Sequence, residues 1–367
     1  YTLWHTLSLH DALPILSEGK ENPFFLYVAY TAPHWPLHAK EEDIKKYKGR
    51  FSKGWDVLRE ERLAKLRKMG ILKDSWPLSP SHDEYFKWDD LGDDEKAWFE
   101  RRMEVYAAMI DCMDQGIGRI IQTLKNTSEL DDTLIIFLSD NGASPEEIRD
   151  QSKKWLSHGV FREKTRDGKP IQFGCNDEIM PGSEETHQSY GRQWANLSNT
   201  PFRYFKGNIH EGGIATPLIF HHPNGNMQKG GMSHYAFQLP DILPTICEIA
   251  GVPYPATFKG REIQPHVGRS VVPILSGDEK AIESKDRLWW EHQDCAGLRK
   301  GDMKLVRLFT QDWELYDLEK DRTELNDLAS KSRELVADME NEWKEIADRV
   351  GVLPSSEISR LKREYDK

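Results

Sequence analysis

Two neighbouring side chains, Asp140 and Asn141, carry the sharpest chemical signal, because they follow the apolar run Leu134–Leu138 (LIIFL) almost directly. Such a run is typical of a buried strand, and open α/β sheets bind their ligands at the carboxyl ends of strands. Carboxylate and amide oxygens are the atoms that Ca²⁺ and Mg²⁺ prefer. The pattern indicates a metal site, although Asp, Asn and the following Gly142 favour a simple tight turn equally well.

A histidine between two prolines, His34, lies in the segment Ala32–His38 (APHWPLH), just after a second apolar run, Phe24–Tyr30 (FFLYVAY). Proline restricts the backbone, so the ring is held on a stiff loop that suits a proton donor needing an acceptor at ~3 Å. If both apolar runs are strands of one parallel sheet, His34 and Asp140 meet at the same edge. The alternative is an ordinary loop histidine.

A third segment, Lys206–Gly213 (KGNIHEGG), combines a lysine with three glycines. Glycine lets the backbone approach an anion closely, and lysine supplies a compact cationic donor, although a simple loop explains the glycines as well. The segment precedes a predicted strand, Leu218–His221. In a parallel sheet it would lie at the end opposite Asp140, so either this strand runs antiparallel or the loop makes a long excursion.

The elements that must position these groups follow from hydrophobic periodicity. Residues 93–124 repeat apolar side chains at helical spacing after an acidic start, and they connect the two apolar runs. Strand, long helix and strand predict an α/β domain with a parallel sheet covered on both faces. A further helix is expected over Asp241–Ala250, ending at Gly251.

The order and spacing of the predicted elements change after about residue 277. Strands are predicted over Leu288–Glu291, Met303–Phe309 and Trp313–Tyr316, at the spacing of an antiparallel meander, followed by an amphipathic helix over Arg333–Val350. We expect these residues to form a second, α+β unit. The charged tail Ser355–Lys367 is expected to be loosely held.

Composition bounds the function. The 367 residues suffice for about two domains. The net charge of −11 disfavours nucleic-acid binding, and no apolar run approaches the ~20 residues of a membrane span. The four cysteines, Cys112, Cys175, Cys247 and Cys295, show no C-x-x-C spacing and leave the redox compartment open. Loop tryptophans near the motifs, Trp35 and Trp194, could stack a sugar or aryl group, but packing beneath loops is their commoner role.

The first residues read as neither a targeting signal nor part of a fold. The stretch His5–Ile15 (HTLSLHDALPI) resembles a translated sequencing-library adapter, which predicts that residues 1–16 are a non-native leader.

Five ordered motifs together resemble the type I sulfatases of the arylsulfatase A class: APHWPLH, LSDNG at 138–142, KGNIHEGG, LPDILPT at 239–245 and WELYDLEKDRTE at 313–324. The resemblance covers residues 22–350. It implies an alkaline-phosphatase-like α/β/α sandwich at 17–285, lacking its N-terminal part, and a small C-terminal subdomain of antiparallel sheet plus helix at 286–367.

The resemblance also implies roles for particular residues. Asp140 and Asn141 inherit a metal-binding role, for Ca²⁺ in preference to Mg²⁺, while His34 and Lys206 lie against the sulfate and its leaving oxygen. The implied substrate is a sulfated carbohydrate or an aryl sulfate, and the implied location is periplasmic or secreted.

Departures from the family pattern matter as much. The formylglycine nucleophile arises from Cys or Ser within C/S-x-P-S-R, and this motif is absent from the 367 residues, as are the paired Asp ligands and the Lys and His that precede APH. We therefore expect this chain to be inactive on sulfate esters and to lack tight Ca²⁺ binding. A phosphatase or phosphodiesterase of the same superfamily, or a non-catalytic glycan-binding protein, are the alternatives.

Overall fold

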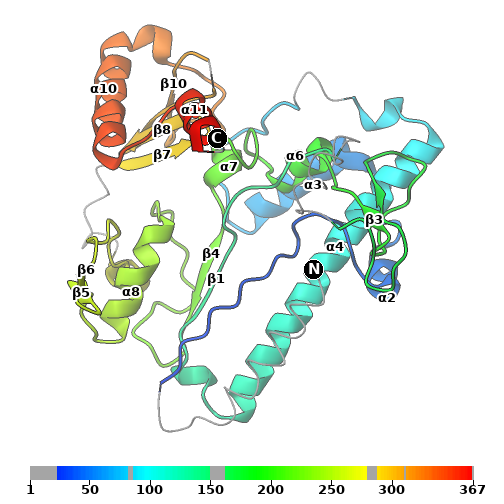
Figure 1. Ribbon diagram of the computed structural model, residues 1–367, viewed down its shortest axis with the longest axis horizontal. Helices are drawn as coiled ribbons and strands as arrows, with labels where there is room; N and C mark the ends of the chain where they lie inside the picture. Colours follow the sequence, from blue (N-terminus) through cyan, green and yellow to red (C-terminus); the bar gives the residue numbers. More distant parts are fainter. Residues whose placement is uncertain (1–22, 82–85, 149–161, 279–286, 310, 366–367) are drawn as a thin grey trace.

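A long helix, α4 (Asp93–Asn126), runs diagonally across the computed structural model, which describes residues 23–81, 86–148, 162–278, 287–309 and 311–365 (Figure 1). Its first turn carries three acidic residues, and the backbone N–H of Gly92 donates to Glu95 Oε2 at 3.0 Å. Both features stabilise a helix N-terminus. The helix predicted over 93–124 is confirmed.

The central strands β1 (Ile135–Leu138) and β4 (Leu218–His221) were expected from their apolar runs and are confirmed, but they pair antiparallel, with Leu138 opposite Leu218. Of the two possibilities left open for Leu218–His221, an antiparallel strand or a long loop excursion, the structure shows the antiparallel strand. Antiparallel pairing puts the loop after β1 and the loop before β4 at the same end of the sheet. The question of direction left open by the sequence is thereby settled.

The segment Phe24–Tyr30 is extended but is not the buried strand that its composition predicts. It runs between the β1–β4 pair and α4 (Figure 1), and Phe25 and Tyr27 are 77% and 81% exposed. An apolar segment becomes a strand only when a neighbouring edge accepts its backbone hydrogen bonds. Among the described residues, β1 and β4 bond only to each other.

Helices and aromatic side chains build the larger core around α4. Trp55, Trp88, Trp98, Phe99 and Trp194 are all buried and pack on one another, several of them edge to face. The elements around this core are α2 (Glu41–Ile44), α3 (Gly54–Lys68), β2 (Gln172–Phe173), β3 (Thr186–His187) and α6 (Arg192–Ser198). Trp194 is fully buried, so it belongs to the core and not to a binding surface.

A group of short elements follows β4 along the chain. The helix predicted over 241–250 is confirmed as α8 (Ile242–Ile249), and Gly251 ends it with a positive φ of 66°. The other elements of the region are α7 (Glu211–Ile214), which precedes β4, and β5 (Thr257–Phe258), β6 (Arg261–Glu262) and α9 (Val272–Leu275), which follow it.

The C-terminal sheet has the strand order β10-β9-β8-β7, all antiparallel, with α10 packed on one face (Figure 1). Its core contains Leu298, Leu305, Leu315, Met339 and Trp343. The strands are β7 (Leu288–His292), β8 (Cys295–Lys300), β9 (Met303–Arg307) and β10 (Glu314–Asp317), and the helix is α10 (Arg333–Val350). The predicted meander plus helix is confirmed, while β8 was missed.

Residues 355–365 of the tail form a helix, α11 (Ser355–Tyr365), which the sequence did not predict. Its first backbone N–H, at Ser355, donates to the carboxylate of Asp294 at 3.1 Å. This contact satisfies one donor of the helix N-terminus and fixes its start on the turn between β7 and β8.

Two predictions stay predictions. The leader at residues 1–16 lies outside the described residues, and the domain boundary at 285/286 adjoins residues 279–286, which also lie outside them. Within the part of the chain that the structure describes, no helix has the length and apolar character needed to cross a membrane.

Candidate functional site

The loop after β1 and the loop before β4 are joined by backbone hydrogen bonds. The N–H of Gly142 donates to the carbonyl oxygen of Gly213 at 2.9 Å, and the N–H of Lys206 donates to the carbonyl oxygen of Ala143 at 3.0 Å. A Cβ at Gly142 would lie only 1.8 Å from the carbonyl oxygen of Gly212. Only glycine permits this approach, so Gly142 serves packing between the loops as well as the turn.

One side-chain amide, Asn199, locks the same two loops together. Its Oδ1 accepts from the N–H of Ala143 at 2.9 Å, and its Nδ2 donates to the carbonyl oxygen of Tyr204, also at 2.9 Å. Sequence reasoning missed this residue. No local signal marks it, because its partners are 5 and 56 residues away along the chain.

The structure brings His34 and Lys206 into direct contact, with Nε2 and Nζ 2.9 Å apart although the residues are 172 positions apart. His34 Nδ1 lies 2.8 Å from the carbonyl oxygen of Trp35, which can only accept, so Nδ1 carries a proton. An ammonium group can only donate, so Nε2 accepts from Lys206. The pair is therefore a neutral imidazole that orients a charged lysine.

An acidic residue, Glu146, flanks this pair and was missed by the sequence analysis. Its Oε1 lies 4.0 Å from Lys206 Nζ, and its Oε2 accepts from Trp35 Nε1 at 3.4 Å. The Glu146 side chain is 43% exposed, so water screens the ion pair and the attraction is weak. Trp35 also packs beside the His34 ring, with centroids 4.7 Å apart.

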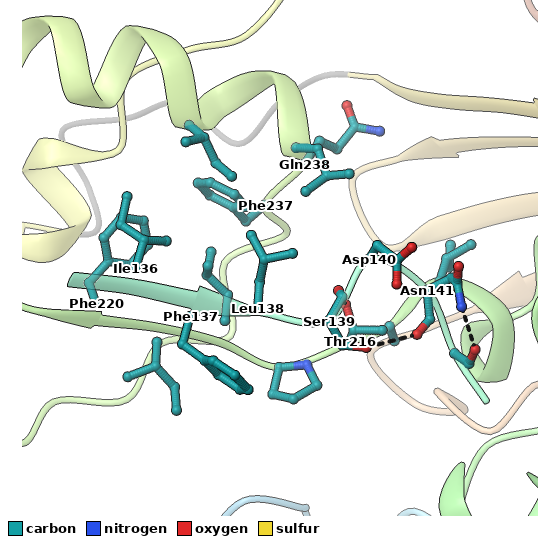
Figure 2. A pocket seen from close by; sticks show the side chains of 18 of the residues that line it. Ile136, Phe137, Leu138, Ser139, Asp140, Asn141, Thr216, Phe220, Phe237 and Gln238 are labelled. Carbon is teal, nitrogen blue, oxygen red and sulfur yellow. Dashed lines mark hydrogen bonds between the residues drawn. The ribbon is translucent and has the colours of Figure 1, made fainter. Parts of the chain in front are cut away.

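The side chains of Asp140 and Asn141 lie just beyond the end of β1 (Figure 2). Asn141 Nδ2 donates to the carbonyl oxygen of Gly142 at 2.8 Å, so its Oδ1 is the amide atom open to a cation. Calcium takes about 6–8 oxygen ligands. The described residues include no cluster of three His, Cys, Asp or Glu side chains that could hold a metal, so these two residues do not by themselves complete a calcium site.

Two further histidines lie near this region but in different surroundings. His187 is buried and stacks on Phe173, with ring centroids 5.0 Å apart. Burial, together with the smaller effect of nearby His38, lowers the pKa of His187 to about 4. His38 Nε2 lies 2.6 Å from the carbonyl oxygen of Thr186, and burial also lowers its pKa. Both rings are thus favoured in the neutral form at neutral pH.

One large cavity is lined by all four side chains singled out in the sequence: His34, Asp140, Asn141 and Lys206. Three segments distant along the chain therefore contribute to one concave surface. The apolar side chains of β1 and β4, including Ile136 and Phe220, line another part of the cavity (Figure 2). His34 and Lys206 are in contact, and all four residues line the same cavity. The chemical roles of the four are those that the resemblance implies.

Comparison with known proteins adds independent information. Residues 4–252 match the family model described as sulfatase, and residues 202–349 match the model described as N-sulphoglucosamine sulphohydrolase, C-terminal. An uncharacterized sulfatase of Schizosaccharomyces pombe is 34% identical over 340 residues, which cover 91% of this chain and 59% of that protein. An arylsulfatase of Klebsiella aerogenes is 34% identical over 261 residues, which cover 71% of this chain and 53% of that protein.

Among solved structures, that of Ps i-CgsB superimposes with a TM-score of 0.56 at 20% sequence identity. The superposition covers 94% of this chain and 54% of that one. At this identity the likeness concerns the fold. The chain thus spans between half and three fifths of the length of the relatives it matches.

Proposed function

The chain belongs to the sulfatase family, and from that premise we propose that the complete protein hydrolyses the sulfate ester of a carbohydrate or of an aryl alcohol. One observation carries the proposal: the Lys206 ammonium lies against a neutral His34 in the same cavity as Asp140 and Asn141. The name of the Klebsiella aerogenes relative suggests the aryl class, and that of the matching C-terminal model, which denotes an N-sulfated sugar, suggests the carbohydrate class.

The chemistry of the Lys206–His34 pair depends on which of the two side chains donates the proton in their hydrogen bond. Lys206 Nζ is the donor of the contact and His34 Nε2 the acceptor, so the transferable proton belongs to the lysine. A cation beside the ester offsets the negative charge of the sulfate oxygens, and more strongly once substrate excludes water. We assign Lys206 to hold the sulfate and protonate the leaving oxygen, and His34 to aim it.

The family nucleophile is formylglycine, and the chain contains no C/S-x-P-S-R motif from which it could form. For the complete protein we propose a formylglycine nucleophile and Ca²⁺ bound with the help of Asp140 and Asn141. This chain contains neither the motif that forms formylglycine nor, among the residues that the structure describes, enough ligands for Ca²⁺. We therefore assign no reaction step to the nucleophile or to the metal. We propose accordingly that the 367-residue chain is catalytically inactive, and that the complete protein is periplasmic or secreted.

Binding of inorganic sulfate to the purified chain tests the proposal without requiring turnover. We expect Lys206→Met to weaken sulfate binding about tenfold or more, since a charge-assisted contact is worth roughly 1.5–3 kcal/mol. The exposed Lys229 supplies the matched control, Lys229→Met, which should bind as the original chain does. Equal sulfate affinity in the original chain and in Lys206→Met would remove the basis of the proposal.

The inactivity of the chain has its own test. Incubation with 4-nitrophenyl sulfate should release no nitrophenol above the rate of a buffer blank. Turnover that disappears in His34→Ala would contradict the proposed inactivity. Sequencing the complete gene separates the reaction classes, because C/S-x-P-S-R specifies a sulfatase, whereas a Thr or Ser nucleophile specifies a phosphatase.

A further inference from the structure

The short helix α7 begins five residues after Lys206 and touches the loop that carries Asp140. The carbonyl oxygen of Gly213 in α7 accepts from Gly142, as described above. The placement of α7 therefore affects both the lysine and the Asp140–Asn141 loop.

A buried ion-pair network holds α7 against the C-terminal sheet. Glu211 Oε1 accepts from Lys304 Nζ at 2.9 Å, and Glu211 Oε2 accepts from Arg322 Nε at 3.0 Å. Lys304 Nζ also lies 2.7 Å from Glu324 Oε1, and Glu324 Oε2 accepts from the backbone N–H of Glu211 at 2.8 Å. We define these four residues, Glu211, Lys304, Arg322 and Glu324, as the α7 clamp.

Three of the four residues of the α7 clamp are deeply buried, and the group is electrically balanced. The side chains of Lys304 and Glu324 are 0% exposed, and that of Glu211 is 5% exposed. Two carboxylates face two cations, so the group carries no net charge. Removing one member of a buried pair leaves an uncompensated charge, which costs far more than the intact pair contributes. The clamp thus favours one position of α7 strongly over displaced positions.

The two residues before Glu211 are docked on the same sheet. Ile209 is buried against Val306 and Tyr316, and a Cβ at Gly297 would lie 2.4 Å from its Cγ2 atom. His210 Nε2 lies 2.8 Å from Glu314 Oε2. Three consecutive residues therefore contact the C-terminal sheet. Only Gly207 and Asn208 separate them from Lys206, so little backbone freedom remains to move the lysine independently.

We propose that Lys304 is a positioning residue for the Lys206–His34 pair. Strand β9 carries Lys304, which fixes Glu211 and through it the loop that aims Lys206 Nζ at His34. The C-terminal sheet thereby helps to position the lysine to which we assign anion binding. The inference rests on the proposed function only for the identity of the anion.

The test combines a position signal with a binding measurement on the full chain. Selective ¹³C labelling of lysine, assigned by comparison with Lys206→Met, gives the Lys206 Cε–Hε resonance as a local sensor. We expect Lys304→Met to shift this resonance and to lower the affinity for inorganic sulfate about tenfold, the effect of losing one charge-assisted contact.

A control in the same subdomain separates positioning from general destabilisation. Met339 is 1% exposed and packs in the core between the C-terminal sheet and α10. This core is separate from the apolar cluster that contains Ile209, Val306 and Tyr316. Met339→Ala should lower the melting temperature while leaving the Lys206 resonance and the sulfate affinity unchanged. If Met339→Ala changes both as much as Lys304→Met does, the positioning role is wrong.

A second variant keeps the test decisive if Lys304→Met does not fold. Ile209→Ala loosens the same segment without leaving a buried charge, and it should shift the Lys206 resonance in the same way. The inference is overturned if the Lys206 resonance is unchanged in whichever of Lys304→Met and Ile209→Ala folds. Absence of sulfate binding by the original chain would refute the proposed function instead, and the resonance would still report the position of Lys206.

Discussion

The buried carboxylate of Glu211 makes the stability of the chain depend on pH in a defined window. Burial alone would raise its pKa, but Lys304 and Arg322 outweigh burial and lower it from 4.5 to about 2. The unfolded chain therefore binds a proton more readily than the folded chain at acidic pH. The stabilisation is complete above pH 4.5 and is lost as the pH falls from 4.5 towards 2.

The magnitude follows from the burial of the pair. Removing one partner of a buried ion pair costs about 3–5 kcal/mol of unfolding free energy, because it leaves an uncompensated charge. Because the side chain is 5% exposed, solvent screening reduces this value little. We expect Glu211→Gln to be less stable at pH 7 by about this amount, since it leaves Lys304 and Arg322 sharing one carboxylate.

Urea unfolding followed by tryptophan fluorescence between pH 2 and 7 measures the effect. The difference in unfolding free energy between the original chain and Glu211→Gln should be largest above pH 4.5 and decrease steadily towards pH 2. Glu319→Gln is the control, because Glu319 is 61% exposed in its contact with Lys73 and contributes little. Parallel curves for the original chain and Glu211→Gln would refute the reasoning.

Three further outcomes are expected. Because burial lowers the pKa of His187 to about 4, its contribution to the unfolding free energy should be complete above pH 6.5 and fade towards pH 4. In urea titrations, His187→Gln should remove about 3 kcal/mol of this pH dependence. An unchanged dependence of the unfolding free energy on pH would contradict the prediction. The variant Glu146→Gln removes the carboxylate that lies 4.0 Å from Lys206. Calorimetry should show that it binds inorganic sulfate more tightly, by about 1 kcal/mol at low salt and by less at high salt. Weaker sulfate binding by Glu146→Gln would count against this prediction. Gly142→Ala should lower the unfolding free energy by about 2 kcal/mol or more, because its Cβ would clash with the backbone. As a control, Gly118→Ala lies in open space on α4 and should raise the unfolding free energy by about 0.5–1 kcal/mol. Equal melting temperatures of the two variants would contradict this prediction.

Local patterns determined several elements closely. Helix α10 begins and ends where its apolar spacing and the following Gly351 predict, because both signals lie within the segment itself. Strand β8 escaped prediction since CAGLRK has no clear apolar run, and it is a strand because β7 and β9 pair with it on both sides. The apolar segment Phe24–Tyr30 shows the converse, a strand composition whose backbone pairs with no strand among the described residues.

The sequence by itself determined which side chains could do chemistry: the acid and amide after β1, the histidine between prolines and the lysine before the paired glycines. Residue type and immediate neighbours suffice for that. Only the tertiary structure decided that β4 runs antiparallel to β1, which brings Lys206 to the end where Asp140 lies. It alone also revealed the α7 clamp, because an ion pair between Glu211 and Lys304 joins residues 93 positions apart and leaves no local trace in the chain.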